Sequence, residues 1–356
     1  MAKSSRRDFI KVSAIGMGSL ILGQFLAACA RALSLTPPPT AVAGVPSSAA
    51  NTPLAPTPNA LAPETAGTAP APTALPPTTT QTPMSIPDLV VARGGEPETL
   101  VRHALAAMGG LERFVPKGAD VIIKPNICVA HPYQYAATTN PWVVGTLVKM
   151  CFEAGAGKVR VMDYPFGCSA EEGYTTSGIK EQVEAAGGEM AYMAPMFKYV
   201  KTPIPNGIDL KMVEVFEDVL KADVLINVPI AKDHSSTRLT LGMKNLMGVI
   251  LHRNTMHINL GQRIADLTSL VRPKLSVVDA VRILVANGPS GGGDLNNVRK
   301  MDTVIVSPDI VAADSYATTL FGLQPNDIAY IAAGAAMGLG RNDLQNLKIE
   351  EISVGA

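Results

Sequence analysis

Short apolar runs that end in polar or turn residues recur along the chain from residue 88 onward. The runs are rich in β-branched residues, which is typical of buried strands. Seven of them are predicted to be strands, at residues 90–92, 121–124, 159–162, 224–228, 275–278, 304–306 and 349–354.

Between several of these runs, apolar residues recur at spacings of three and four, which predicts helices. The predicted helices cover residues 97–108, 142–154, 178–186, 237–249 and 260–271. This alternation is typical of an α/β fold with a mostly parallel sheet flanked by helices. Residues 197–216 break the alternation and contain the turn Pro205-Asn206-Gly207, so they are predicted to form a small hairpin insertion.

The first 28 residues have the pattern of an export signal. Arg6-Arg7 and the following Phe, Ile and Lys resemble a twin-arginine signal, and Leu26-Ala27-Ala28-Cys29 resembles a lipoprotein cleavage site. An uncleaved membrane helix is the weaker interpretation, because the apolar run is shorter than the ~20 residues that a spanning helix needs. We expect the twin-arginine translocase to export the protein. A lipid on Cys29 would then anchor it to the outer face of the cytoplasmic membrane of a bacterial envelope.

Residues 29–87 are predicted to be a disordered tether between the lipid and the folded body. Residues 31–87 contain 14 prolines but only two charged residues, Arg31 and Glu64. Such a segment is rich in Pro, Ala and Thr and cannot bury enough apolar surface to offset the entropy of ordering its backbone. The α/β domain is therefore expected to occupy residues 88–356.

Overall charge argues against a nucleic-acid partner. The full chain has 30 Lys and Arg against 30 Asp and Glu, and removal of the signal takes away a net charge of +3, which leaves −3. Binding to phosphate backbones requires a clustered excess of basic residues, and this sequence lacks one.

Polar residues at the ends of the predicted strands predict a binding site. Ligands of open α/β sheets bind beyond the carboxyl ends of the strands. Lys232 follows one strand, and Ser235 or Ser236 is expected to cap the next helix, on which Lys244 would lie. We expect Lys232 and Lys244 to converge on one anionic small molecule; the alternative is a solvated lysine beside a capped helix. The predicted ligand-binding set is Lys124, Asn126, Lys232, Thr237, Lys244 and Asn245.

Three further residues are candidates for acid–base chemistry. His234 lies beside Lys232 after a strand, and it is expected either to transfer a proton or to contact the ligand. Asp163 and Asp279 end strands and can bind a cation or act as bases; the alternative is a capping or turn role. His252 and His257 flank Arg253 and are expected to close over the crevice.

The cysteines leave several interpretations open. Cys128 and His131 have a C-x-x-H spacing, and Cys168 follows a strand that is expected to neighbour theirs. The three side chains can form a metal site, the two cysteines can form a disulfide in an oxidising compartment, or the thiols can remain unpaired. Cys151 lies among apolar residues of a predicted helix and is expected to pack in the core.

Several stretches resemble the domain of unknown function 362 family. The resemblance covers about residues 90–352 and is most specific in the Lys-Asn-Leu-Met-Gly sequence at 244–248. Some members carry a ferredoxin-like module with Cys-x-x-Cys spacing, but this sequence has no such spacing, so an iron–sulfur role is not transferred. The stretches that carry the resemblance are 124–126, 223–234, 240–248, 272–279, 288–289 and 309–314.

Two functions follow from these patterns. In the first, the exported lipoprotein is an enzyme, with redox chemistry as one option, whose lysines hold an anionic substrate or cofactor while Asn126 and Asn245 orient it. In the second, it captures a ligand in the same pocket without chemistry. Capture proteins usually have two lobes and a hinge, and the sequence shows no duplicated α/β half, which favours the enzyme. No motif identifies a cofactor, although twin-arginine export of folded proteins favours one that binds before export.

Overall fold

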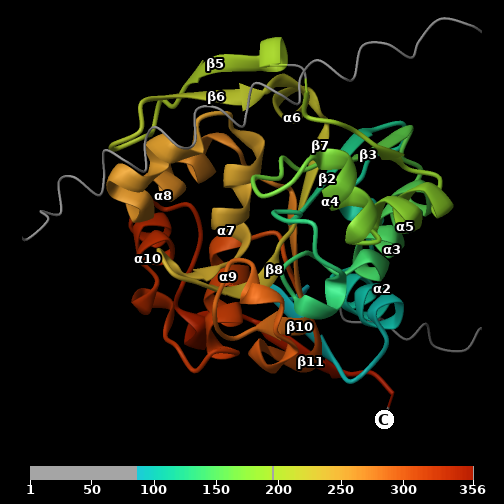
Figure 1. Ribbon diagram of the computed structural model, residues 1–356. Coiled ribbons are helices and arrows are strands. Elements are labelled where there is room, and N and C mark those ends of the chain that lie inside the picture. Colours follow the sequence, from blue (N-terminus) through green and yellow to red (C-terminus); the bar gives the residue numbers. More distant parts are fainter. Residues whose placement is uncertain (1–85, 195, 356) are drawn as a thin grey trace, which may run out of the picture. The chain divides into compact units, whose positions relative to one another are not determined.

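A ten-stranded sheet lies at the centre of the domain, with helices on both of its faces (Figure 1). The structure is a computed structural model that describes residues 86–194 and 196–355. The predicted signal peptide at 1–28, Cys29 and the tether up to residue 85 lie outside the described residues. Within the described part of the chain, no helix combines the length and the apolar character needed to cross a membrane.

The strands confirm the predicted mostly parallel sheet. They are β1 (Leu89–Arg93), β2 (Asp120–Pro125), β3 (Lys158–Val161), β4 (Glu189–Met190), β7 (Val224–Val228), β8 (Ile230–His234), β9 (Arg238–Thr240), β10 (Leu275–Leu284), β11 (Val298–Ser307) and β12 (Ile349–Ser353). Their order is β12-β1-β11-β10-β7-β2-β3-β4, and β8 pairs with β10 and β9 beside this path. Only the pairs that β11 makes with β1 and β10, and the β8–β9 pair, are antiparallel. All seven predicted strands are present.

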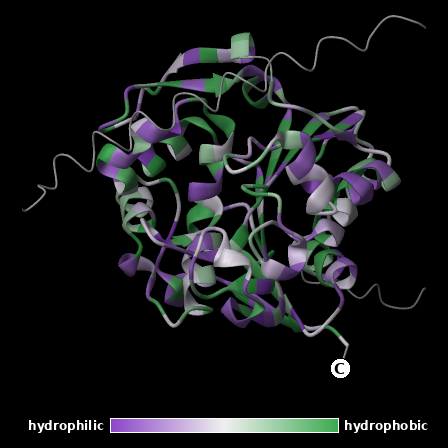
Figure 2. Ribbon diagram, in the orientation of Figure 1, coloured by the Kyte–Doolittle hydropathy of each residue, from purple (hydrophilic) through white to green (hydrophobic). Residues whose placement is uncertain are grey.

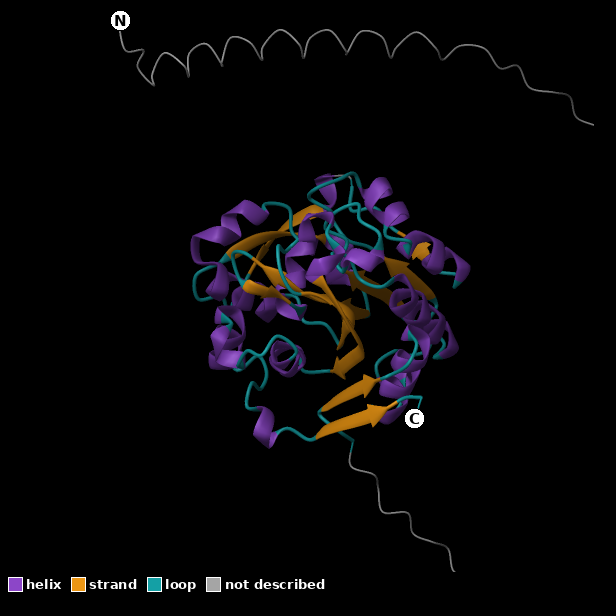
Figure 3. Cartoon of the chain, turned by 60° about the horizontal axis from the view of Figure 1, so that its bottom comes forward, coloured by secondary structure: helices purple, strands orange, loops and turns teal. Residues whose placement is uncertain are grey.

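The helices cover both faces of the sheet (Figure 3). They are α2 (Pro97–Ala107), α3 (Pro141–Glu153), α4 (Ala170–Thr176), α5 (Ile179–Ala185), α6 (Glu217–Lys221), α7 (Gly242–Asn245), α8 (Leu260–Leu270), α9 (Ile310–Thr319) and α10 (Ala329–Ala336). Four of the five predicted helices correspond to α2, α3, α5 and α8, with ends shifted by at most one residue.

The strands bury alternate side chains in two separate cores. In β2, Ile122 packs into the core beneath α7 to α10, whereas Val121 and Ile123 pack into the core beneath α2, α3 and α5. Successive side chains of a strand point to opposite faces of the sheet, so a strand that is apolar throughout requires cover on both sides. Figure 2 shows this apolar character along the central strands.

A two-stranded antiparallel hairpin confirms the predicted insertion. β5 (Tyr199–Pro203) pairs with β6 (Met212–Phe216) apart from the main sheet. The loop between them is held by the buried carboxylate of Asp266, which accepts hydrogen bonds from the backbone N–H groups of Ile208, Asp209 and Leu210 at 2.7–2.8 Å.

The predicted helix at 237–249 is wrong in its first half, whereas residues 242–249 are helical. Residues 238–240 instead form β9, in which Thr240 pairs with Lys232 and Leu239 with Asp233 of β8. Helix α7 begins only at Gly242, where the Asp314 carboxylate accepts the backbone N–H groups of Gly242 at 2.6 Å and Met243 at 2.8 Å. Pairing with β8 and capping by a distant carboxylate thus override a weak local helical period. Ser235 and Ser236 thus lie in the turn between β8 and β9 and do not begin a helix.

Candidate functional site

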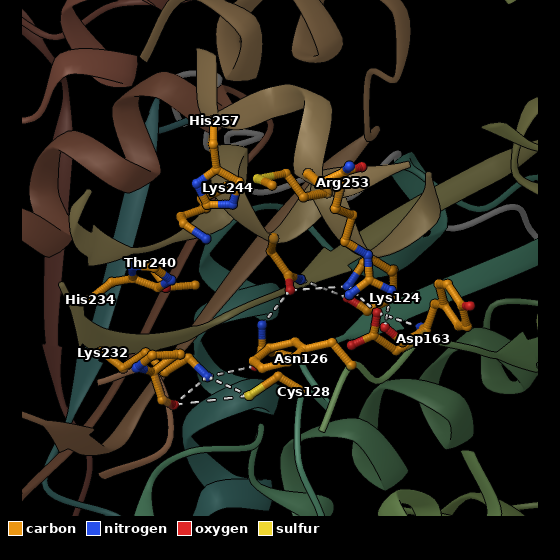
Figure 4. Close-up of a pocket in the computed structure, with 17 residues that line it drawn as sticks. Lys124, Asn126, Cys128, Asp163, Lys232, His234, Thr240, Lys244, Arg253 and His257 are labelled. Carbon is orange, nitrogen blue, oxygen red and sulfur yellow. Dashed lines mark hydrogen bonds and ion pairs between the residues drawn. The ribbon is translucent and has the colours of Figure 1, made fainter. Parts of the chain in front are cut away.

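A pocket of about 420 Å³ opens where several strands end. The ends of β2 and β3, the strands β8 and β9, and the short helix α7 with the 3-10 turn after it all contribute side chains (Figure 4). The pocket brings together most of the predicted site residues with others that were not predicted. Its lining consists of Lys124, Asn126, Cys128, Asp163, Tyr164, Phe166, Lys232, His234, Thr240, Lys244, Asn245, Met247, Gly248, Arg253, Asn254, His257 and Pro289.

Lys124, at the end of β2, is fully buried and has three hydrogen-bond acceptors. Its Nζ donates to Asp163 Oδ1 at 2.8 Å, to the Pro125 carbonyl at 2.7 Å and to Asn245 Oδ1 at 3.0 Å. Burial lowers the pKa of Lys124, and the attraction of Asp163 opposes this effect. An ammonium group has three N–H donors, so those of Lys124 are all used within the protein.

Asp163 is held by the backbone as well as by Lys124. Its Oδ1 also accepts the backbone N–H of Tyr164 at 2.8 Å, and its Oδ2 accepts that of Ile127 at 2.6 Å. A carboxylate that accepts several hydrogen bonds and an ion pair is stabilised as an anion. This geometry gives Asp163 a positioning role rather than that of an available base.

Gly248 lets the 3-10 turn Leu246–Val249 lie against this ion pair. A Cβ at position 248 would come within 2.2 Å of Asp163 Oδ1 and 2.6 Å of Lys124 Nζ. Real Cβ atoms are essentially never this close to another heavy atom, so a larger residue would displace either the turn or the ion pair.

Lys232, in β8, is also saturated by protein acceptors. Its Nζ lies 2.9 Å from Asn126 Oδ1, 2.7 Å from the Ala137 carbonyl, 3.0 Å from the Pro289 carbonyl and 3.1 Å from Cys128 Sγ. The expectation that Lys232 and Lys244 bind one anion directly is therefore revised. Lys232 adds positive charge to the pocket, but its N–H groups already point at protein acceptors.

Two asparagines join the two buried lysines into one network. Asn126 Nδ2 donates to Asn245 Oδ1 at 2.9 Å, and that same oxygen accepts Lys124. Asn245 Nδ2 in turn donates to Asn227 Oδ1 at 2.9 Å. Every polar atom of Asn126 and Asn245 thus has a protein partner, which fixes the orientation of the pocket floor.

Lys244, in α7, differs from the other two lysines. It forms no hydrogen bond or ion pair with any residue that the structure describes, although its side chain is largely buried. Burial, with smaller contributions from Lys232 and Arg253, lowers the pKa of Lys244 to about 8. In Figure 4, its amine enters the pocket from the side opposite Lys232 and Cys128. Thr240 contributes a second unsatisfied group, a buried hydroxyl without a hydrogen-bond partner.

His234 is a neutral hydrogen-bond donor in this geometry. Its Nδ1 accepts the backbone N–H of Ser236 at 3.1 Å, which assigns the ring proton to Nε2. Burial, followed by repulsion from Lys244 and Lys232, lowers the pKa of His234 to about 3. The predicted proton transfer by His234 is therefore less favoured than the predicted contact with the ligand, because its accepting nitrogen is occupied.

Arg253 and the aromatic residues of the lining were not among the predicted ligand-binding residues. The Arg253 guanidinium lies over the Tyr164 ring, 4.6 Å from its centroid, and donates to the Tyr164 carbonyl. His257 also lines the pocket, whereas the exposed His252 instead lies 3.1 Å from Glu214. In the sequence, the pair of histidines on either side of Arg253 was the feature that indicated a contribution of residues 252–257 to the site.

Two residues of the predicted catalytic and ligand-binding sets lie outside the pocket lining. Asp279 is buried in β10 and accepts the backbone N–H groups of Asn140 at 2.7 Å and Val281 at 3.0 Å. Burial raises the pKa of Asp279 to about 7. These contacts match the alternative role, the positioning of backbone at the start of α3. Thr237 donates its hydroxyl to the Leu239 carbonyl at 2.9 Å, because the segment is a turn rather than a helix.

The predicted metal ligands do not form a cluster. Across residues 86–194 and 196–355, no group of three or more His, Cys, Asp or Glu side chains is placed to hold a metal ion. His131 contacts the ring of Tyr135 instead, with 5.8 Å between the ring centroids. Cys128, Cys151 and Cys168 are all unpaired, and Cys151 is buried in α3 as expected.

Three comparisons relate this chain to known proteins. The chain is similar to the "Thylakoid-associated protein sll1697" of Synechocystis sp., with 26% identity over 256 residues. The aligned region covers 67% of this chain and 74% of that protein. Two solved structures are similar at 11% identity. They are a lactate racemase apoprotein from Thermoanaerobacterium thermosaccharolyticum, with a TM-score of 0.40 over 60% of this chain, and a protein from Thermotoga maritima, with a TM-score of 0.36 over 64%. The chain spans only 53% and 60% of these two proteins.

The family comparison covers the strands and loops that build the pocket. The family described as "Domain of unknown function (DUF362)" matches residues 121–319, which are more than half of the chain. This segment begins in β2, ends with α9 and includes every residue of the pocket lining. The chain therefore belongs to the DUF362 family.

Proposed function

We propose that this protein is an exported lipoprotein whose α/β domain binds a small anionic substrate or cofactor in the pocket around Lys244. The observation that carries the proposal is the Lys244 ammonium, which enters the pocket without an acceptor from any residue of the described chain. A largely buried cation without a partner is unfavourable, and a bound anion would supply the missing acceptor.

The charge of the lining supports the same ligand class. Four cationic side chains face one carboxylate, Asp163, which is already paired with Lys124. The cations are Lys124, Lys232, Lys244 and Arg253. Because the body carries a net negative charge from Cys29 onward, this positive charge is local to the pocket. The volume also lies within the range of about 300–1,000 Å³ typical of small-molecule sites.

An enzyme is the better candidate of the two, and non-catalytic ligand capture is the alternative. All described strands except the β5–β6 hairpin belong to one sheet, so the pocket walls do not come from two lobes around a hinge. Lys244, Thr240 and His234 also present an amine, a hydroxyl and an N–H group to one space. Substrate contacts of this kind serve catalysis as well as binding.

The envelope location rests on sequence patterns and on the related protein. Arg6-Arg7 and the Leu26-to-Cys29 motif support export and lipidation, and the name of the Synechocystis relative describes that protein as thylakoid-associated. Membrane association is thus a property that the two proteins would share.

The ligand class is tested by calorimetric titration of the full-length protein with butyrate and with inorganic phosphate. We expect Lys244→Ala to weaken binding of at least one of these anions by about 1–3 kcal/mol, the usual contribution of a hydrogen bond to a charged group. Lys201→Ala, which removes an exposed lysine of β5, is the matched control and should leave binding unchanged. Equal affinities in the wild type and Lys244→Ala would argue against an anion at Lys244.

A second measurement separates the enzyme from the capture protein. Native mass spectrometry and an absorption spectrum of protein purified from its exporting host would identify what is bound. A retained cofactor supports the enzyme, whereas an unmodified metabolite supports capture.

Lipid attachment is tested by metabolic labelling with a clickable fatty acid. Cys29→Ala should abolish labelling and leave the body folded, because the cysteine is the only acylation site that the motif provides. Arg6 and Arg7 replaced together by Lys should block export. Labelling that persists in Cys29→Ala would remove the lipoprotein part of the proposal.

A further inference from the structure

The three lysines of the pocket differ in what their nitrogen atoms contact. Lys124 has three protein acceptors and Lys232 has four. Lys244 has none among the described residues. A primary amine attacks a carbonyl carbon through its lone pair, which exists only when the amine is neutral and is not held as an ammonium by acceptors. Lys244 is the one lysine of the lining that meets this requirement.

The surroundings of Lys244 disfavour its protonated form. Lys232 and His234 face it from β8, Arg253 and His257 from the 3-10 segment Arg253–Asn259, and Lys124 lies across the pocket floor. The one carboxylate of the lining, Asp163, is engaged by Lys124, and Cys128 is the group that partly offsets the repulsion. With a pKa of about 8, about half of the Lys244 side chains are neutral at pH 8.

The other unsatisfied groups suit a carbonyl oxygen next to a carboxylate. The Thr240 hydroxyl has no partner, and His234 has its ring proton on Nε2. The Arg253 guanidinium uses one nitrogen for the Tyr164 carbonyl, which leaves other N–H groups for a carboxylate. Met247 and Phe166 provide apolar wall for a short carbon chain.

We infer that Lys244 forms a reversible imine with the ketone of a small 2-oxo acid bound in this pocket. The neutral amine adds to the carbonyl carbon, and its N–H proton moves to the former carbonyl oxygen to give a carbinolamine. Loss of that hydroxyl and the second N–H proton as water leaves the C=N bond, so the step consumes no oxidant or reductant. The inference rests on the proposed function and names its substrate class.

Reductive trapping tests the inference on the full-length protein. The protein is incubated with 2-oxobutyrate and cyanoborohydride, which reduces an imine to a stable secondary amine, and the product is analysed by intact mass and peptide mapping. We expect one adduct, located at Lys244, and none with butyrate, which has the same carboxylate and chain length but no ketone. Lys244→Arg keeps the positive charge and should lose the adduct, whereas Lys201→Arg should retain it.

The titrations with butyrate and with 2-oxobutyrate distinguish failure of this inference from failure of the proposed function. If both acids bind with a requirement for Lys244 but 2-oxobutyrate gives no adduct, the imine is excluded and anion binding stands. An adduct that is equally abundant in Lys244→Arg would also overturn the inference. If neither acid nor inorganic phosphate binds and no adduct forms, both proposals fail.

Discussion

The floor of the pocket, which carries Lys124 and Lys232, differs from its open wall, which carries Lys244 and Thr240. The difference lies in whether the polar groups have hydrogen-bond partners within the protein. On the floor, Lys124 and Lys232 direct every N–H donor at a protein acceptor, and two asparagines connect them. On the wall, Lys244 and the Thr240 hydroxyl have no partner among the described residues. Because buried polar groups are normally satisfied, the floor is explained by the fold alone, whereas on the wall the proposed ligand would supply the missing partners.

This comparison distinguishes two lysines whose charge is satisfied by the fold from one lysine, Lys244, whose charge is proposed to bind a ligand. Removal of a floor lysine leaves its buried hydrogen-bond partners without a donor, so stability should fall. Removal of Lys244, the lysine of the wall, leaves none of the described protein groups without a partner. Stability should therefore remain or rise while ligand binding falls. The experiments below test that contrast, in order of decreasing effect.

The largest effect is expected for Lys124→Met. This change leaves the Asp163 carboxylate buried without its cation, and breaking a buried ion pair on one side typically costs about 3–5 kcal/mol. Urea denaturation monitored by circular dichroism would measure the loss in the free energy of unfolding. Adding Asp163→Asn should recover part of it, and a loss no greater than that of Lys201→Met would contradict a structural role for the floor.

A smaller loss is expected for Gly248→Ala, which adds one methyl group against the same ion pair. The new Cβ would lie 2.2 Å from Asp163 Oδ1, so the 3-10 turn must shift. Overpacking of this kind usually costs about 1–3 kcal/mol. The same denaturation experiment measures it, together with butyrate affinity, because the displaced turn also carries Met247 of the lining. Unchanged stability would mean that the turn is not packed tightly against Lys124 and Asp163.

The smallest change in stability, with the opposite sign, is expected for Lys244→Met. The folded-state pKa of Lys244, about 8, lies below its ordinary value of 10.5. The unfolded chain therefore binds more protons between these pH values, and the stability of the wild type should rise with pH from about 8 to 10.5. Below pH 8 the full cost of the charged side chain is present, and the difference between 8 and 10.5 corresponds to at most about 3 kcal/mol. Because solvent reaches the partly exposed Lys244 side chain and screens its charge, Lys244→Met should be more stable there by on the order of 1–2 kcal/mol.

The comparison of the two proteins across this pH range is the decisive measurement. As the pH rises from 8 to 10.5, loss of the Lys244 proton in the folded wild type costs progressively less free energy. The stability difference between Lys244→Met and the wild type should therefore shrink over this range. Groups that titrate elsewhere in the chain cancel in the difference. A constant difference would show that Lys244 is not destabilised as a cation.

Sequence patterns were sufficient for the fold class and for the edge of the sheet where the pocket lies. The β-branched runs predicted seven strands that are present, and the rule that ligands bind at strand ends located Lys124, Asn126 and Lys232 before their contacts were known. These features depend on residues close together in the chain and on the general geometry of parallel sheets. Boundaries of the matching helices differ by at most one residue.

Tertiary structure alone decided which lysine lacks an acceptor among the described residues and which predicted residues lie outside the pocket. Lys124 meets Asn245 across 121 positions of the chain, and Lys232 meets Asn126 across 106. Because β9 pairs with β8, Thr237 lies in a turn and not in the expected helix. Asp279 accepts a backbone N–H group at the start of α3 and does not line the pocket. Local periodicity does not contain these contacts, because the number of acceptors around an amine is set by segments that become neighbours only when the sheet assembles.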